Sequence, residues 1–165
     1  FPSGADIRLQ TGTVAGTINV TAAFATESGI NVTPDSPPAI SLQIPAAPPR
    51  VLDVQIDGRT TSGFTIAVTA LSTTRSLTQL ELDFVSSPKF NVPTGRFTLN
   101  VESASSAWYR SGESQAYGSL FTARIPFTFQ APSGSTSLYQ MFQSISATLT
   151  NEKGRSNSLS VTPHP

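Results

Sequence analysis

Cysteine is absent from the 165 residues, and histidine occurs only once, as His164. The lack of cysteine excludes disulfide frameworks, thiolate metal sites and cysteine nucleophiles. His164 stands between two prolines at the end of the given sequence, where we expect a loose tail. A Ser-His-Asp triad needs its histidine held against the nucleophile, and no Gly-x-Ser-x-Gly elbow occurs. The sequence therefore predicts no catalytic residue and no enzymatic activity.

Charge is scarce and balanced. Ten basic and ten acidic side chains make up 12% of the chain, against about 25% in an average soluble domain. Such a chain lacks the electrostatic footprint of a protein that binds nucleic acid or an anionic membrane. No apolar run approaches the roughly 18 residues of a membrane-spanning helix, and phosphate-binding loops and dinucleotide fingerprints are missing. We therefore expect no nucleic-acid partner, no membrane insertion, no metal and no cofactor.

Hydroxyl side chains are abundant, with 23 Ser and 21 Thr, and ten Phe accompany many Val and Ile. β-Branched and aromatic residues favour strands. Apolar and polar residues alternate along most of the chain, as in strands with one buried face, which leaves little room for helix. The alternation predicts an all-β protein of about nine strands. They are expected around Thr13–Thr26, Ile40–Ile44, Leu52–Ile56, Phe64–Ala70, Leu80–Phe84, Phe97–Val101, Phe121–Phe129, Ile145–Leu149 and Leu159–Val161.

Turn residues separate these segments. Asp57-Gly58 opens a loop that suits a hairpin between Leu52–Ile56 and Phe64–Ala70. Asn151-Glu152-Lys153-Gly154 similarly predicts the turn of the final hairpin. Pro126 lies inside the longest alternating run. Because proline cannot donate to a sheet ladder, that strand should be an edge strand or carry a bulge there.

Proline concentrates between Pro45 and Pro49, a composition that suits a short semi-rigid spacer. Residues 1–45 before it hold two strands and are too short to fold alone. They form either an extension that packs on the second unit or the remnant of a preceding module. Residues 46–165 form the second unit, in which we expect an antiparallel sandwich of about seven strands.

A weak internal similarity favours the remnant of a preceding module. Gly12–Thr21 resembles Gly118–Thr128, and Ile40–Pro45 resembles Leu159–Pro163. A repeat of this kind would make the whole protein a tandem array, with this chain from its C-terminal end.

Three features of the second unit carry a family resemblance. It begins with Pro48-Pro49-Arg50-Val51-Leu52, contains Ser62-Gly63-Phe64-Thr65-Ile66, and ends with a strand-turn-strand from Ala147 to Asn157. Over residues 46–163 this layout resembles the immunoglobulin-like or fibronectin-like repeats of bacterial secreted and cell-surface proteins. The resemblance implies an immunoglobulin-like β-sandwich with a non-catalytic spacer, adhesion or ligand-presenting role. It also implies an extracellular or cell-surface location, with neighbouring modules, a glycan or a surface protein as partners.

One segment stands out as a candidate binding site. Residues 107–118 hold the only Trp and two of the three Tyr in a polar, Gly-containing stretch. Aromatic rings stack on sugar faces or anchor protein partners, and an arginine adds bidentate recognition. The alternative role for Trp108 is to plug the edge of the core, with Tyr109 capping a strand. A carbohydrate-binding module would use Trp108, Tyr109, Arg110 and Tyr117.

Carboxylates offer two weaker candidates. Glu81 and Asp83 share one strand face, as paired glycosidase carboxylates can. Their apolar neighbours form the inward set, so we expect this pair to face solvent. Asp35, Asp53 and Asp57 lie near the module junction and offer oxygen ligands for calcium, although no EF-hand pattern is present.

Overall fold

The structure, a computed structural model, describes residues 8–60, 62–89, 94–128 and 141–163. Most regular structure in these residues is antiparallel β-sheet, which confirms the all-β prediction. The elements are β1 (Gly16–Thr21), β2 (Ala39–Ile44), β3 (Arg50–Asp57), β4 (Gly63–Leu71), β5 (Gln79–Ser86), β6 (Gly95–Asn100), α1 (Glu102–Arg110), the 3-10 helix η1 (Glu113–Tyr117), β7 (Leu120–Thr128), β8 (Phe142–Asn151), β9 (Gly154–Arg155) and β10 (Leu159–Val161).

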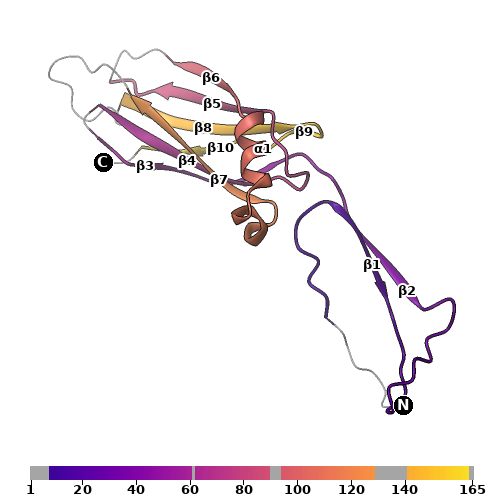
Figure 1. Cartoon of the computed structure of the whole chain (residues 1–165). Helices are drawn as coiled ribbons and strands as arrows, with labels where there is room; N and C mark the ends of the chain where they lie inside the picture. Colours follow the sequence, from indigo (N-terminus) through magenta and orange to yellow (C-terminus); the bar gives the residue numbers. More distant parts are fainter. Residues whose placement is uncertain (1–7, 61, 90–93, 129–140, 164–165) are drawn as a thin grey trace.

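Strands β1 and β2 pair with each other as a separate two-stranded sheet. We call residues 16–44, from β1 through the connection to β2, the hairpin, and residues 50–163 the body. The alternation over Thr13–Thr26 overestimates the first strand, because Ala15 already bonds to Thr73 in the body and Ala25 bridges Asn31 in the connection. Figure 1 shows the hairpin projecting away from one end of the body.

The body consists of two antiparallel sheets. One has the strand order β10-β8-β5-β6, with β9 paired to β8, and the other has the order β3-β4-β7. Alternate residues of both sheets meet in one core, in which Ile66, Leu80, Leu82 and Ile145 are 0% exposed. Each buried aliphatic side chain of this size contributes about 1.5–3 kcal/mol to folding, so this core stabilises the body.

The turn residues act as predicted. Strands β3 and β4 pair across the loop that Asp57-Gly58 opens, and Gly58 has a φ of 54°, a conformation that glycine adopts readily. Strands β8 and β9 pair across the Asn151–Gly154 turn. Pro126 lies on β7, at the edge of its sheet in the described residues. The prediction that proline marks an edge strand is therefore confirmed.

One prediction from alternation is wrong on β3. Leu52 was expected to face inward with Val54 and Ile56, but it is 40% exposed. The pairing of β3 with β4 shifts between Val51 and Asp53, so Leu52 is the extra residue of a β-bulge and turns outward. The little helix that is present, α1 and η1, occupies most of the chain between β6 and β7.

The open side of the body, between the edge strands β6 and β7, is closed in two ways. Near one end, the ring centres of Phe97 on β6 and Phe127 on β7 lie 5.9 Å apart, and each lies 5.2 Å from the ring centre of Phe84. Such edge-to-face ring pairs add stability beyond their buried area. Near the other end, α1 packs across the gap through Tyr109 and Trp108. The helix is thus part of the body (Figure 1), and it carries three of the four candidate binding residues.

Candidate functional site

Helix α1 forms where the sequence predicted a polar loop. Asn100 Oδ1 accepts the amide of Glu102 at 3.0 Å, which satisfies one of the free donors at the helix start. Glu102 lies in the first turn and Arg110 in the last, where each charge is favoured by the helix dipole. The side chains that turn toward the body are Ser105, Trp108 and Tyr109, spaced as one helical face.

Tyr109 is a core residue. Its side chain is 8% exposed, its ring packs against Phe121 at 6.1 Å, and its hydroxyl donates to the carbonyl oxygen of Ser119 at 3.0 Å. The guanidinium of Arg75 lies 5.3 Å from its ring centre and donates to its carbonyl oxygen at 2.6 Å. Burial raises the pKa of the Tyr109 phenol well above its ordinary value. Tyr109 therefore holds α1 in place, and it also lines a cavity beneath the helix.

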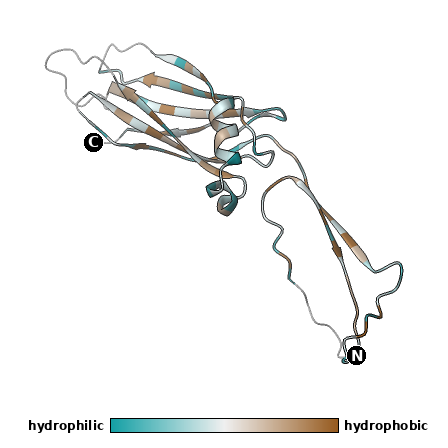
Figure 2. Cartoon of the chain, in the orientation of Figure 1, coloured by the Kyte–Doolittle hydropathy of each residue, from teal (hydrophilic) through white to brown (hydrophobic). Residues whose placement is uncertain are grey.

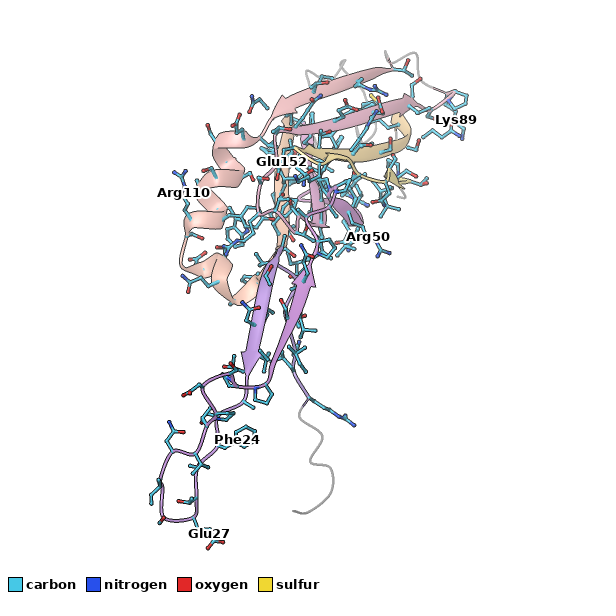
Figure 3. The ribbon with its side chains drawn as sticks, turned by 90° about the vertical axis from the view of Figure 1, so that its right-hand side faces the viewer. Phe24, Glu27, Arg50, Lys89, Arg110 and Glu152 are labelled. Carbon is cyan, nitrogen blue, oxygen red and sulfur yellow. The ribbon has the colours of Figure 1, made fainter. Side chains whose placement is uncertain are left out.

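Trp108 and Tyr117 come together at the surface. Their ring centres lie 6.0 Å apart, with an angle of 42° between the ring planes. Trp108 is half-buried against the core, whereas Tyr117 is 55% exposed. Arg110 is exposed and labelled on the outer side of α1 in Figure 3. Of the four sequence-predicted residues, the structure thus brings Trp108 and Tyr117 into one aromatic pair, whereas Tyr109 packs against Phe121.

Two hollows flank Trp108. The first is a mostly apolar cavity of about 200 Å³ beneath α1, and the second is a hollow of about 270 Å³ on the η1 side. Trp108, Phe121 and Thr122 line both. Trp108 Nε1 and Ser105 Oγ are buried there and have no hydrogen-bond partner among the residues that the structure describes, which is costly for a polar atom. A ligand with an apolar ring face and an acceptor oxygen would suit these groups.

The paired carboxylates face outward but already have cationic partners. Arg96 Nε donates to Asp83 Oδ1 at 2.8 Å, and Arg155 pairs with Glu81. The hydrogen bond and the charge of Asp83 raise the pKa of the Arg96 guanidinium. The group is thus an ion-pair network across β6, β5 and β9. In the described part of the chain, no group of three or more acidic, histidine or cysteine side chains could hold a metal ion.

The junction between hairpin and body rests on hydrogen bonds that the sequence did not predict. The carbonyl oxygen of Thr73 accepts a hydrogen bond from the amide of Ala15 at 2.8 Å. The hydroxyl oxygen of Thr73 accepts one from the amide of Ala47 at 3.0 Å. Asn151 Nδ2 donates to the carbonyl oxygen of Ala47 at 3.0 Å, and Ser119 donates its amide to Thr13 Oγ1 at 3.1 Å. The chain segments that flank the hairpin on both sides are therefore hydrogen-bonded to the body.

Glu152 extends this network. Its carboxylate accepts the hydroxyl of Ser76 at 2.6 Å, and this hydrogen bond lowers the pKa of Glu152. Ser76 is linked through Thr74 to Asn151. The signals for this network are weak in sequence, because most partners are Ser, Thr or Asn residues among many, and the bonds of Asn151 and Glu152 join residues about 70 or more positions apart.

Comparison with known proteins gives no family. No protein-family model matches the chain, and no curated protein matches it. Among the described residues, no helix has the length and apolar character needed to cross a membrane.

Proposed function

We propose that this chain is a non-catalytic structural or adhesion module of an exported bacterial multidomain protein, acting as a spacer or surface-contact domain. The strand arrangement of the body supports an immunoglobulin-like sandwich. In that fold, strands A, B and E share one sheet, while C, F and G share the other. Here the first, second and fifth strands of the body, β3, β4 and β7, form one sheet, and β5, β8 and β10 belong to the other.

The observation that carries the spacer role is the junction network. Prolines at positions 45, 48 and 49 stiffen the connection, and the bonds of Ala15, Ala47 and Asn151 attach the hairpin at both of its ends. Two anchored strands restrict bending more than one linker does. The hydroxyl-rich, weakly charged surface suits an extracellular protein with few electrostatic contacts.

A distance measurement between spin labels tests the junction. The chain has no native cysteine, so Gln43→Cys on β2 and Thr98→Cys on β6 give two unique exposed labelling sites. We expect pulsed electron paramagnetic resonance to give one narrow distance distribution. Thr73→Val with Asn151→Ala, which removes the side-chain bonds to Ala47, should broaden it. A distribution that is already broad without these substitutions would contradict a spacer of fixed direction.

A second candidate function is carbohydrate binding at the Trp108–Tyr117 pair. The specific observation is the pair itself, beside two hollows and an unpartnered indole Nε1. An aromatic ring provides the apolar face on which a sugar ring stacks, and the indole N–H is a donor for a sugar oxygen.

A glycan array on the full chain tests this second function. Tyr117 is the better residue to change, since it is exposed and its loss leaves the core intact. We expect Tyr117→Ala to weaken glycan retention about tenfold, as the loss of a contact worth roughly 1.4 kcal/mol would. Tyr117→Phe, which keeps the ring, should retain binding. Absence of any retained glycan on the unchanged protein would exclude this function.

A further inference from the structure

The hairpin presents an apolar face that nothing in the described structure covers. Ile18, Val20, Ile40 and Leu42 lie on one side of the β1–β2 sheet, and the last three are 40%, 66% and 37% exposed. The residues between them in sequence are polar and lie on the other side. Figure 2 shows this alternation of apolar and polar residues along the hairpin strands. A two-stranded sheet of this kind is marginal in water and gains stability when its apolar face is covered.

The hairpin repeats the last strand pair of the body, β8 with β10, in the same register. In both, an apolar pair, a polar pair and a second apolar pair follow one another across an antiparallel ladder. The paired residues are Ile18 with Leu42, Asn19 with Ser41 and Val20 with Ile40 in the hairpin, and Ile145 with Val161, Ser146 with Ser160 and Ala147 with Leu159 in the body.

This correspondence revises the predicted repeat. The sequence comparison matched β2 to β10, which the register supports, but it matched the β1 region to Gly118–Thr128. That segment forms β7, which lies in the other sheet and does not pair with β10. The turns agree with the new match, because Glu27-Ser28-Gly29 and Glu152-Lys153-Gly154 each end on a glycine with positive φ, 82° and 131°.

The body shows what covers such a face. Ile145 and Ala147 are 0% exposed because the sheet β3-β4-β7 packs over them. Leu159 and Val161 of β10 pack against the same core. In addition, β5 pairs with the second edge of β8. In the described structure, β1 pairs only with β2 and has no strand in the place of β5.

We propose that the hairpin is the last strand pair of a second sandwich unit of the same kind, and that its apolar face docks on that unit. The occupant is a three-stranded sheet like β3-β4-β7, joined by a strand like β5 that pairs with β1. This inference deepens the proposed array role and rests on it, since it names the partner of the hairpin. Each unit then shares a hydrogen-bonded junction with its neighbour, as stacked repeats do.

A fusion protein tests the docking. Residues 46–141 of this chain, which carry β3 to β7 but neither β8 nor β10, are placed before residue 1 of the full 165-residue chain. We expect the hairpin to supply the strand pair that the added segment lacks. Because proteolysis follows the population of the open form, thermolysin should cleave the added segment at least about tenfold more slowly than when the hairpin face is disrupted.

Two paired variants of the fusion provide the comparison. Val20→Asp with Ile40→Asp places charges on the apolar face, whereas Asn19→Asp with Ser41→Asp places the same charges on the polar face. We expect rapid cleavage of the added segment in the first variant and resistance in the second, while the body stays resistant in both. Equal cleavage of the added segment in all three fusions, or equal resistance in all three, would overturn the proposal.

The unfused chain provides a further control. If it sediments as a dimer that Val20→Asp with Ile40→Asp converts to a monomer, the hairpin face binds a second hairpin, and the proposal is wrong. The spin-label measurement concerns only the junction within the 165-residue chain. A flexible junction and an unoccupied hairpin face are therefore separate outcomes.

Discussion

Tyr109 fixes helix α1 to the core with a buried hydroxyl that donates to the carbonyl oxygen of Ser119 at 3.0 Å. Burial raises its pKa above the ordinary value of 10.0. The folded protein thus keeps the phenol proton at pH values where the unfolded chain releases it, and release favours unfolding. We expect this contribution to be fully present below about pH 10 and to be lost as the pH rises above it.

Urea unfolding between about pH 8 and pH 11 measures this dependence. Tyr109→Phe removes the buried titrating group at a cost of about 1 kcal/mol for the lost hydrogen bond. The variant should lose less stability than the unchanged protein over the alkaline part of the range. If the free energy of unfolding falls equally steeply with rising pH in both proteins, Tyr109 is not the source of the alkaline loss.

Asn157 is a second single residue whose hydrogen bonds stabilise the fold. Its side chain accepts the amide of Val51 and donates to the carbonyl oxygen of Val51, both at 3.0 Å, across 106 residues of sequence. We expect Asn157→Ala to lower the free energy of unfolding by about 1–3 kcal/mol, since both backbone groups lose their partner. Asn157→Asp keeps the acceptor for the Val51 amide but places a second acceptor oxygen against the Val51 carbonyl, so it should not restore the stability of the unchanged protein. Denaturant unfolding compares them, and no loss in the Ala variant would contradict this role.

At the scale of elements, strand β3 provides a direct test of the bulge. Val51 and Val54 are 1% and 6% exposed, whereas Leu52 between them is 40% exposed. We expect Leu52→Thr to change the free energy of unfolding by no more than about 0.5 kcal/mol. Val51→Thr buries a hydroxyl and should cost about 1–3 kcal/mol. Thermal or urea unfolding measures both, and the reverse ranking would place Leu52 in the core.

Most strands could be predicted from sequence, because a period of two is visible wherever one sheet face is buried. The bulge at Leu52 could not, since it depends on the register with β4. Helix α1 was missed because it turns only a narrow stripe toward the core, with small Ser and Ala residues around Trp108. The aromatic residues were found, but buried Tyr109 lies on α1 and exposed Tyr117 on η1, two helical segments that the alternation did not predict.

At the scale of the whole molecule, the body and the hairpin differ in whether their apolar faces are covered. The two sheets of the body cover each other. Helix α1 and the rings of Phe84, Phe97 and Phe127 close the open side between β6 and β7. The hairpin has the same strand pattern without a covering sheet, although its ends are anchored (Figures 1 and 3). The sequence predicted a two-stranded N-terminal piece before Pro45, but the register match with β8 and β10 needed the observed pairing.

Native-state hydrogen exchange on the full chain tests this division most directly. We expect the amides of β4, β5 and β8 to exchange only through global unfolding, because these strands carry the fully buried residues. Amides of β1 and β2 should exchange at least about a hundredfold faster, through opening of the hairpin alone. Equal protection in β1, β2 and the central strands would contradict the account, since it would make the hairpin part of the same cooperative unit as the body.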